Sequence, residues 1–142
     1  MDAQRIKRLL NLKQRLEKVK KGEVVEARSE LEVAQQGLSQ AEKEQQKRLQ
    51  DLYGDNTLSI DELQDRARFV TLAGQQVVKA RDTVSKHDEI VAQKENQRIE
   101  ATRDVKTFEL LRDRKKEEMR IVEKRVEQGQ ADEVAASVRS RK

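Results

Sequence analysis

The chain has 142 residues, of which 41% are charged and 2% aromatic, with no Pro or Cys and a formal net charge of +4. This composition is too polar for a large three-dimensional core, and the lack of Cys excludes disulfides and thiolate metal sites. The apolar residues are nevertheless periodic, which favours a coiled coil over a disordered chain.

The first predicted helix covers about residues 2–53. Its apolar residues recur every seven positions, with Gln45 as a polar gap, and form the series Val24, Leu31, Leu38 and Leu52. A companion series three residues later consists of Ala27, Ala34 and Ala41. Spacing of seven with an offset of three is the pattern of a coiled-coil seam.

A turn is predicted over residues 54–59. The run Gly54-Asp55-Asn56-Thr57 is rich in turn formers. Ser59, followed by Glu62 three residues later, has the pattern of a capping box, and Leu58 and Leu63 have the spacing of a hydrophobic staple. A second helix should therefore start near Ile60.

The second predicted helix covers about residues 60–128, and Gly129 should weaken it, so that the residues beyond can fray. Its main series, interrupted by Arg98 and Arg112, is Leu63, Val70, Val77, Val84, Val91, Val105, Met119 and Val126. The companion series is Ala73, Ala80, Ala101, Phe108 and Val122. The short connection favours antiparallel neighbours. We therefore predict an all-α fold in which two long helices form an antiparallel coiled-coil hairpin, the second helix being longer, with residues 1–142 as a single unit.

The register follows if Leu52 faces Leu63 across the turn, which places Val24 opposite Val91. Beyond this level both helices offer their next apolar residue after eight positions, at Leu16 and Ile99. Matching shifts would keep the seam closed and change the local supercoil. The same register places Lys20 opposite Glu95.

Charge is unevenly distributed along the chain. Residues 1–21 carry eight Lys or Arg against two acids, and residues 112–142 carry ten against seven, so the middle is acidic. A hairpin with a basic open end and an acidic turn suggests two different partners. The alternative is that charge only keeps the rod soluble.

About thirty residues after Asp113 have no partner within the hairpin. This overhang carries Met119, Ile121, Val122, Val126, Val134 and Val138. An exposed apolar stripe on a projecting helix predicts a docking surface.

The sequence predicts no catalytic residue, metal site or cofactor. His87 is the only histidine and falls at a seam position, where a structural role is expected. No phosphate-binding, dinucleotide-binding or zinc-protease motif is present. Nucleic-acid binding is not expected, because the basic end interleaves acids and lacks stacking aromatics. No apolar run could span a membrane and no signal peptide is apparent, so a cytoplasmic protein is expected.

Tyr53 and Phe69 flank the turn in a chain with only three aromatic residues. They either form an interface hot spot or plug the splayed end of the coil.

The C-terminal region resembles a known family. The stretch Phe108–Glu118 reads FELLRDRKKEE, Glu127-Gln128 follows, and Asp132-Glu133 comes after that. These residues resemble the endings of the FliJ family, the stalk proteins of flagellar type III export. Stalk proteins of virulence type III secretion systems are similar in size and shape.

The resemblance implies a non-enzymatic central stalk, or coupling component, of a type III protein export apparatus. Such proteins insert into the hexameric export ATPase, touch the cytoplasmic domain of the membrane export gate and bind export chaperones. They act in the cytoplasm, at the cytoplasmic face of the inner membrane. Carried over by position, the gate contact is Leu49, Tyr53, Phe69, Ala73 and Gln76. The overhang residues Met119, Val122 and Val126 are then assigned to the ATPase. The alternative is a generic coiled-coil scaffold or dimerisation protein.

Overall fold

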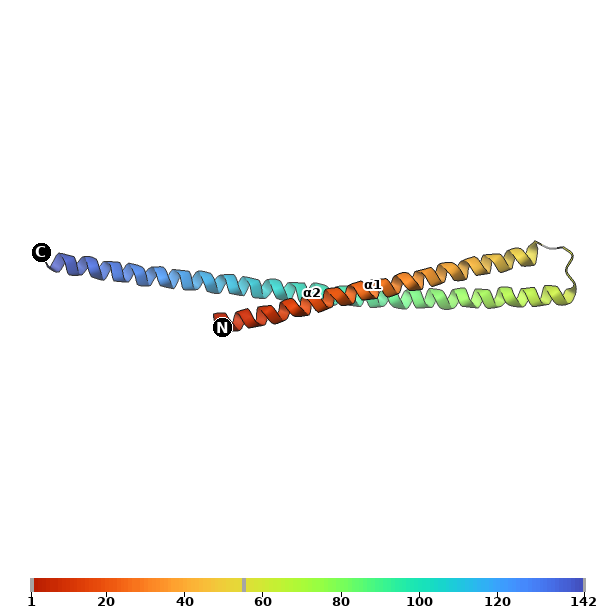
Figure 1. Cartoon of the computed structure of the whole chain (residues 1–142), viewed down its shortest axis with the longest axis horizontal. Helices are drawn as coiled ribbons and strands as arrows, with labels where there is room; N and C mark the ends of the chain where they lie inside the picture. The colour runs from red at the N-terminus through yellow and green to blue at the C-terminus, as the bar shows by residue number, and fades with distance from the viewer. Residues whose placement is uncertain (1, 55, 142) are drawn as a thin grey trace. The chain divides into compact units, whose positions relative to one another are not determined.

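The computed structural model describes residues 2–54 and 56–141, which form two helices and no strand within those ranges. Helix α1 spans Ala3–Tyr53 and helix α2 spans Ile60–Ser140 (Figure 1). The helices pack against each other as an antiparallel hairpin, and α2, with 81 residues, is longer than α1, with 51. The predicted fold class is confirmed.

Local hydrogen bonds fix the helix ends. Asp2 caps α1 by accepting a hydrogen bond on its carboxylate from the Gln4 N–H at 3.0 Å. Ser59 caps α2 as predicted, because its hydroxyl accepts from the Glu62 N–H at 3.2 Å. At the other end of α1, the Gly54 N–H donates to the Gln50 carbonyl at 2.8 Å. Asp55, part of the predicted turn, lies outside the described residues.

Helix α2 does not end near residue 128. It continues past Gly129 to Ser140. A single glycine costs about 1 kcal/mol in a helix interior, which a long run of good helix formers around it can offset.

The chain divides into two compact units. The turn unit comprises residues 19–98, and the terminal unit comprises residues 1–18 with 99–142. The description of residues 1–142 as one domain stays a prediction.

The turn unit has a narrow seam of the predicted periodicity. Val24, Ala27, Ala73 and Val77 are buried, and Val77 is only 2% exposed. The remaining members of the two series in this unit are mostly half-buried, among them Leu31, Ala34, Leu38, Ala41, Val70, Ala80, Val84 and Val91. Leu63, predicted to face Leu52, is 46% exposed and outside the seam.

The observed register differs from the predicted one. Lys20 contacts Gln97 rather than Glu95, and Glu23 contacts Lys94. Each partner on α2 lies two residues further along than the predicted register requires. The physical reason lies in the knobs-into-holes packing of antiparallel helices. Residues of the main series on one helix lie opposite residues of the companion series, three positions later, on the other helix. The prediction had paired like positions.

The terminal unit has its own short core of Ile6, Leu10, Ala101 and Val105. Leu16 and Ile99 are 41% and 37% exposed, so the predicted switch to an eight-residue spacing is wrong. The seven-residue spacing instead continues along α1 through the half-buried Lys13 and Glu17. Long side chains such as Lys can cover a seam with their apolar stems while their charged ends stay in water. Here the Lys13 ammonium reaches the Asp104 carboxylate at 3.4 Å.

Candidate docking surfaces

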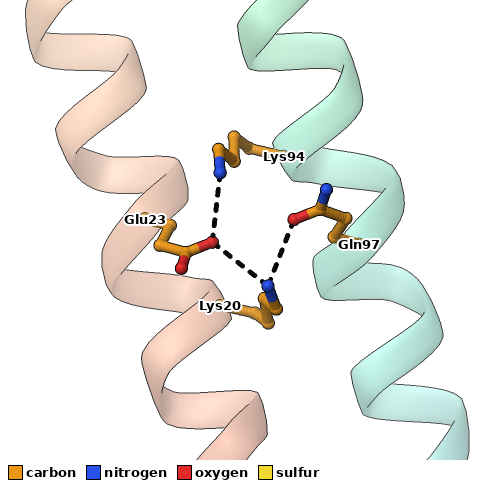
Figure 2. Close-up of polar contacts among 4 residues, drawn as sticks. All are labelled: Lys20, Glu23, Lys94 and Gln97. Carbon is orange, nitrogen blue, oxygen red and sulfur yellow. Dashed lines mark hydrogen bonds and ion pairs between the residues drawn. The ribbon is translucent and has the colours of Figure 1, made fainter.

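A polar cluster interrupts the seam in the turn unit (Figure 2). The Glu23 carboxylate lies 3.4 Å from the ammonium groups of both Lys20 and Lys94, and Lys20 also donates to the Gln97 amide oxygen at 3.3 Å. Desolvation raises the pKa of Glu23. The two lysines outweigh this effect through their hydrogen bonds and their positive charges, so the pKa of Glu23 lies below its usual value. These contacts satisfy the charges of the cluster within the hairpin.

The cluster is flanked by a second set of ion pairs. Glu95 pairs with Arg28 on α1 and with Arg98 on its own helix, at 3.0 Å for the latter. On the same side of the coil, Arg81 lies 3.8 Å from Glu42. The flanking charges are therefore complementary across the coil.

Near the turn, one arginine lies over an exposed aromatic ring, and a second arginine links α2 to the backbone of α1. The Arg48 guanidinium lies 5.0 Å from the centre of the Phe69 ring, which is 47% exposed. Arg66 donates to the Asp51 carbonyl at 2.7 Å. These four residues line a shallow cavity of about 330 Å³. Sequence reasoning missed the two arginines, although each lies close to an aromatic residue in an acidic region.

The five residues assigned to the export gate differ in how far their side chains are exposed. Tyr53, the last residue of α1, is 78% exposed, and Gln76 is also exposed. Leu49 is half-buried. Ala73 is buried in the seam, so a partner cannot reach its side chain while the hairpin is closed.

The three residues assigned to the ATPase lie together on the overhang of α2. Met119, Val122 and Val126 are 48%, 57% and 54% exposed, and every described residue from Glu117 onwards is exposed. Glu117 and Arg120 form an ion pair at 2.6 Å on another side of the helix. The hydrogen bond from Arg120 lowers the pKa of Glu117. Met119, Val122 and Val126 form the apolar ladder of the overhang, and each side chain remains about half exposed.

A groove opens in the terminal unit where α1 begins. It is a cavity of about 410 Å³ with an apolar lining that includes Ala3, Ile6, Leu10 and Met119. Its basic lining residues are Lys7, Arg112, Lys115 and Lys116. Sequence reasoning missed this groove, although Leu10 continues the seven-residue spacing of Val24 and Ile6 continues that of Ala27.

His87 lies in the seam, half-buried, as its position predicted. Its Nδ1 is buried and has no hydrogen-bond partner among the described residues. Within those residues, no group of three or more His, Asp or Glu side chains is arranged to hold a metal ion. Neither described helix is long and apolar enough to cross a membrane.

Comparison with known proteins supports the resemblance drawn from the C-terminal residues. The search of curated proteins and the search of solved structures gave no match. The sequence does match the family model described as "Flagellar FliJ protein", over residues 1–142. Because this match covers the whole length of two antiparallel helices with an overhanging α2, the chain belongs to the FliJ family of flagellar export components.

Proposed function

We propose that this protein is the non-enzymatic central stalk of a flagellar type III export apparatus, binding the hexameric export ATPase, the export gate and export chaperones. The observation that carries the proposal is the apolar ladder on the overhang of α2, whose three side chains are each about half exposed. The protein works in the cytoplasm, at the cytoplasmic face of the inner membrane, through these partners.

The ATPase contact is made by Met119, Val122 and Val126. These side chains follow the coiled-coil spacing and stand on a helix that projects past the start of α1 (Figure 1). A projecting helix with apolar residues on one face fits a groove or pore of a partner protein. ATP hydrolysis belongs to the ATPase.

The export gate binds the surface beside the turn. Leu49, Tyr53, Phe69 and Gln76 provide its accessible side chains, and the buried Ala73 sets the close approach of the helices beneath them. Aromatic residues commonly anchor small interfaces.

The ladder is tested by replacing Met119, Val122 and Val126 with Gln, which preserves helix propensity and removes apolar surface. We expect the triple variant to bind the export ATPase at least about tenfold more weakly, or roughly 1.4 kcal/mol. Its stimulation of ATP hydrolysis should fall in parallel. Binding is measured by titration and hydrolysis by phosphate release.

The matched control replaces Ile121, Val134 and Val138 with Gln, because these apolar residues are exposed on the same helix but outside the ladder. This variant should stimulate the ATPase normally. Truncation after Asp113 should also abolish stimulation while preserving a helical hairpin by circular dichroism. Full stimulation by the ladder variant or by the truncated chain would rule out the overhang as the ATPase contact.

A further inference from the structure

The seam of α2 continues beyond the region that α1 covers. In the terminal unit, its buried or half-buried positions are Ala101, Val105, Phe108, Arg112 and Lys115. The same spacing then reaches the exposed residues Met119, Val122, Val126, Gly129, Glu133 and Ala136. Residues 112–136 thus hold about three and a half heptads, with apolar residues at four of the eight seam positions and charged residues at three, so the charges must be matched by any helix that pairs with this segment.

The distribution of charge along this segment indicates which kind of helix could pair with it, and in which orientation. Residues 112–125 carry seven Lys or Arg against four acids, whereas residues 126–138 carry three acids and no Lys or Arg. An antiparallel copy of the segment would bring each basic half against an acidic half. A parallel copy would bring Lys115 against Lys115 and Glu133 against Glu133.

We propose that the overhang of α2 pairs with the overhang of a second copy of this chain, as an antiparallel two-helix coiled coil with twofold symmetry. Val122 faces Val126 of the second copy, and Met119 faces Gly129. Lys115 faces Glu133, and Arg112 faces Ala136. By symmetry each pairing occurs twice.

The geometry of the turn unit identifies the flanking pairs. There the antiparallel seam brings Arg28 against Glu95 and Glu42 against Arg81, at its flanking positions. Transferred to the overhang, the same flank places Lys116 against Ser137 and Glu123 against Gln130 of the second copy, without a like-charge pair. The opposite flank of the proposed register places Glu118 against Arg125 of the second copy. Neither Lys115 nor Glu133 has an ion-pair partner among residues 2–54 and 56–141 of its own chain, so both charges are available.

Charge also selects this register over its neighbours. A slip of one heptad in one direction brings Glu118 against Glu118 of the second copy. The opposite slip brings Arg125 against Arg125 and Glu118 against Asp132. Like charges at facing positions are destabilising, so only the proposed register is free of such pairs.

The groove of the terminal unit accommodates the end of the second helix. In this register, residues 131–138 of the second copy come level with Arg112 and Lys115, which line the groove. This segment offers Asp132 and Glu133 to the basic residues, and Ala136 to the apolar ones. The groove and the ladder thus form one continuous surface for a single helix.

Self-association covers Met119, Val122 and Val126, the residues that the proposed function assigns to the ATPase. The two contacts therefore exclude each other, and a free stalk keeps its apolar ladder covered until a partner displaces the second copy. The inference itself does not depend on the proposed function, because it is tested on the isolated chain.

The test is sedimentation velocity of the full chain over a wide range of concentrations. We expect a monomer–dimer equilibrium. Glu133→Lys and Lys115→Glu should each raise the dissociation constant at least about tenfold, and the double variant should restore it to within about threefold of the wild type. Glu127→Lys is the matched control, because it makes the same charge change outside the seam and its flanks, and it should leave the equilibrium unchanged.

A second measurement uses crosslinking between chains. A mixture of Val122→Cys chains with Val126→Cys chains should form disulfide-linked dimers on oxidation, whereas Ile121→Cys with Val134→Cys should not. A chain that stays monomeric at every concentration overturns the proposal. Failure of the charge exchange to restore the dimer, or equal crosslinking of the two mixtures, overturns it as well.

Discussion

Charged side chains occupy seam positions in the turn unit, where an apolar residue is usual. Lys20, Glu23 and Lys94 satisfy one another at 3.4 Å and remain partly exposed. Ion pairs in such surroundings contribute little net stability, because solvent screens them and long side chains lose rotamer freedom. We infer that the cluster helps to select the register, since a slip of one heptad would take Glu23 away from Lys94.

Glu23→Gln tests the electrostatic part of this cluster. Because the folded-state pKa of Glu23 lies below its ordinary value of 4.5, the ionised carboxylate stabilises the fold above that pH. This contribution is lost as pH falls through 4.5 and then through the lower folded-state pKa. The wild type should therefore melt above the variant at pH 7, and the difference should close in acid. Circular dichroism melting at several pH values measures it.

The control for this prediction is the background that carries Lys20→Gln and Lys94→Gln. Removing the two cations removes the cause of the lowered pKa, so Glu23→Gln should then have no pH-dependent effect. A difference of the same size in both backgrounds would show that the lysines are not responsible.

Gly54 is required by the end of α1. A Cβ at this position would lie 2.7 Å from the Gln50 carbonyl oxygen, which is backbone and cannot move aside cheaply. Gly54→Ala should therefore destabilise the hairpin by about 1 kcal/mol, as measured by chemical denaturation.

Gly37→Ala is the matched control, because a Cβ there meets nothing within 4 Å. Inside a helix, this exchange should stabilise the protein by about 0.5–1 kcal/mol. If both variants shift stability in the same direction, the contact with Gln50 is not what selects glycine.

At the scale of the elements, the seam of α2 keeps the same seven-residue spacing from the turn to the overhang. Val77 and Val105 are buried at the heptad position that Met119 and Val126 occupy further along, and Ala101 is buried at the position that Val122 occupies. One uninterrupted spacing means that the same face that packs on α1 becomes the exposed face of the overhang. The overhang is thus a seam without its partner rather than a separate surface.

The observed register is tested by paired cysteines. Ala41 on α1 and Val77 on α2 lie between Glu42, whose carboxylate is 3.8 Å from Arg81, and Gln45, whose amide nitrogen lies 3.6 Å from where a Cβ at Gly74 would be. Ala41→Cys with Val77→Cys should therefore form a disulfide within one chain, seen as a faster band on non-reducing gels. Ala41→Cys with Val84→Cys, one heptad away, should not. Crosslinking of the second pair alone would refute this register.

At the scale of the whole molecule, two candidate docking surfaces belong to different units. The turn unit presents Tyr53 and Phe69, and the terminal unit presents the ladder and the groove. Neither surface shares a residue with the other, so substitutions in one should leave binding at the other intact.

Tyr53→Ala with Phe69→Ala tests this independence. Both rings are well exposed, and Phe69 is held by Arg48, so the pair can anchor a small interface. We expect binding to the cytoplasmic domain of the export gate to weaken by at least about tenfold, or roughly 1.4 kcal/mol. Binding to the ATPase should be unchanged. Both are measured by titration, with circular dichroism melting as the control.

Normal gate binding by this double variant would show that the two rings merely fill the end of the coil. Loss of binding accompanied by melting of the hairpin would lead to the same conclusion. Arg48→Gln adds a finer comparison, because it removes the cation from Phe69 and keeps both rings. Its effect on gate binding should be smaller than that of the double variant.

The sequence by itself determined the two helices, the turn, the Ser59 cap and the excess length of α2. Each depends on local spacing or on a short-range hydrogen bond, which the order of residues specifies directly. The exposed ladder on the overhang followed as well, since α2 is longer than α1 and its described residues from Glu117 onwards are exposed. The family followed from the C-terminal residues.

The tertiary structure alone decided how the two helices meet. It placed Lys20 against Gln97, kept Lys13 and Glu17 in the seam in place of Leu16, and buried Ala73. It also opened the groove beside Ile6 and set Arg48 over Phe69. A heptad pattern repeats about every two helical turns, so registers that differ by one heptad present the same spacing of apolar residues. Only packing of both helices together, with their charges in place, selects one of them.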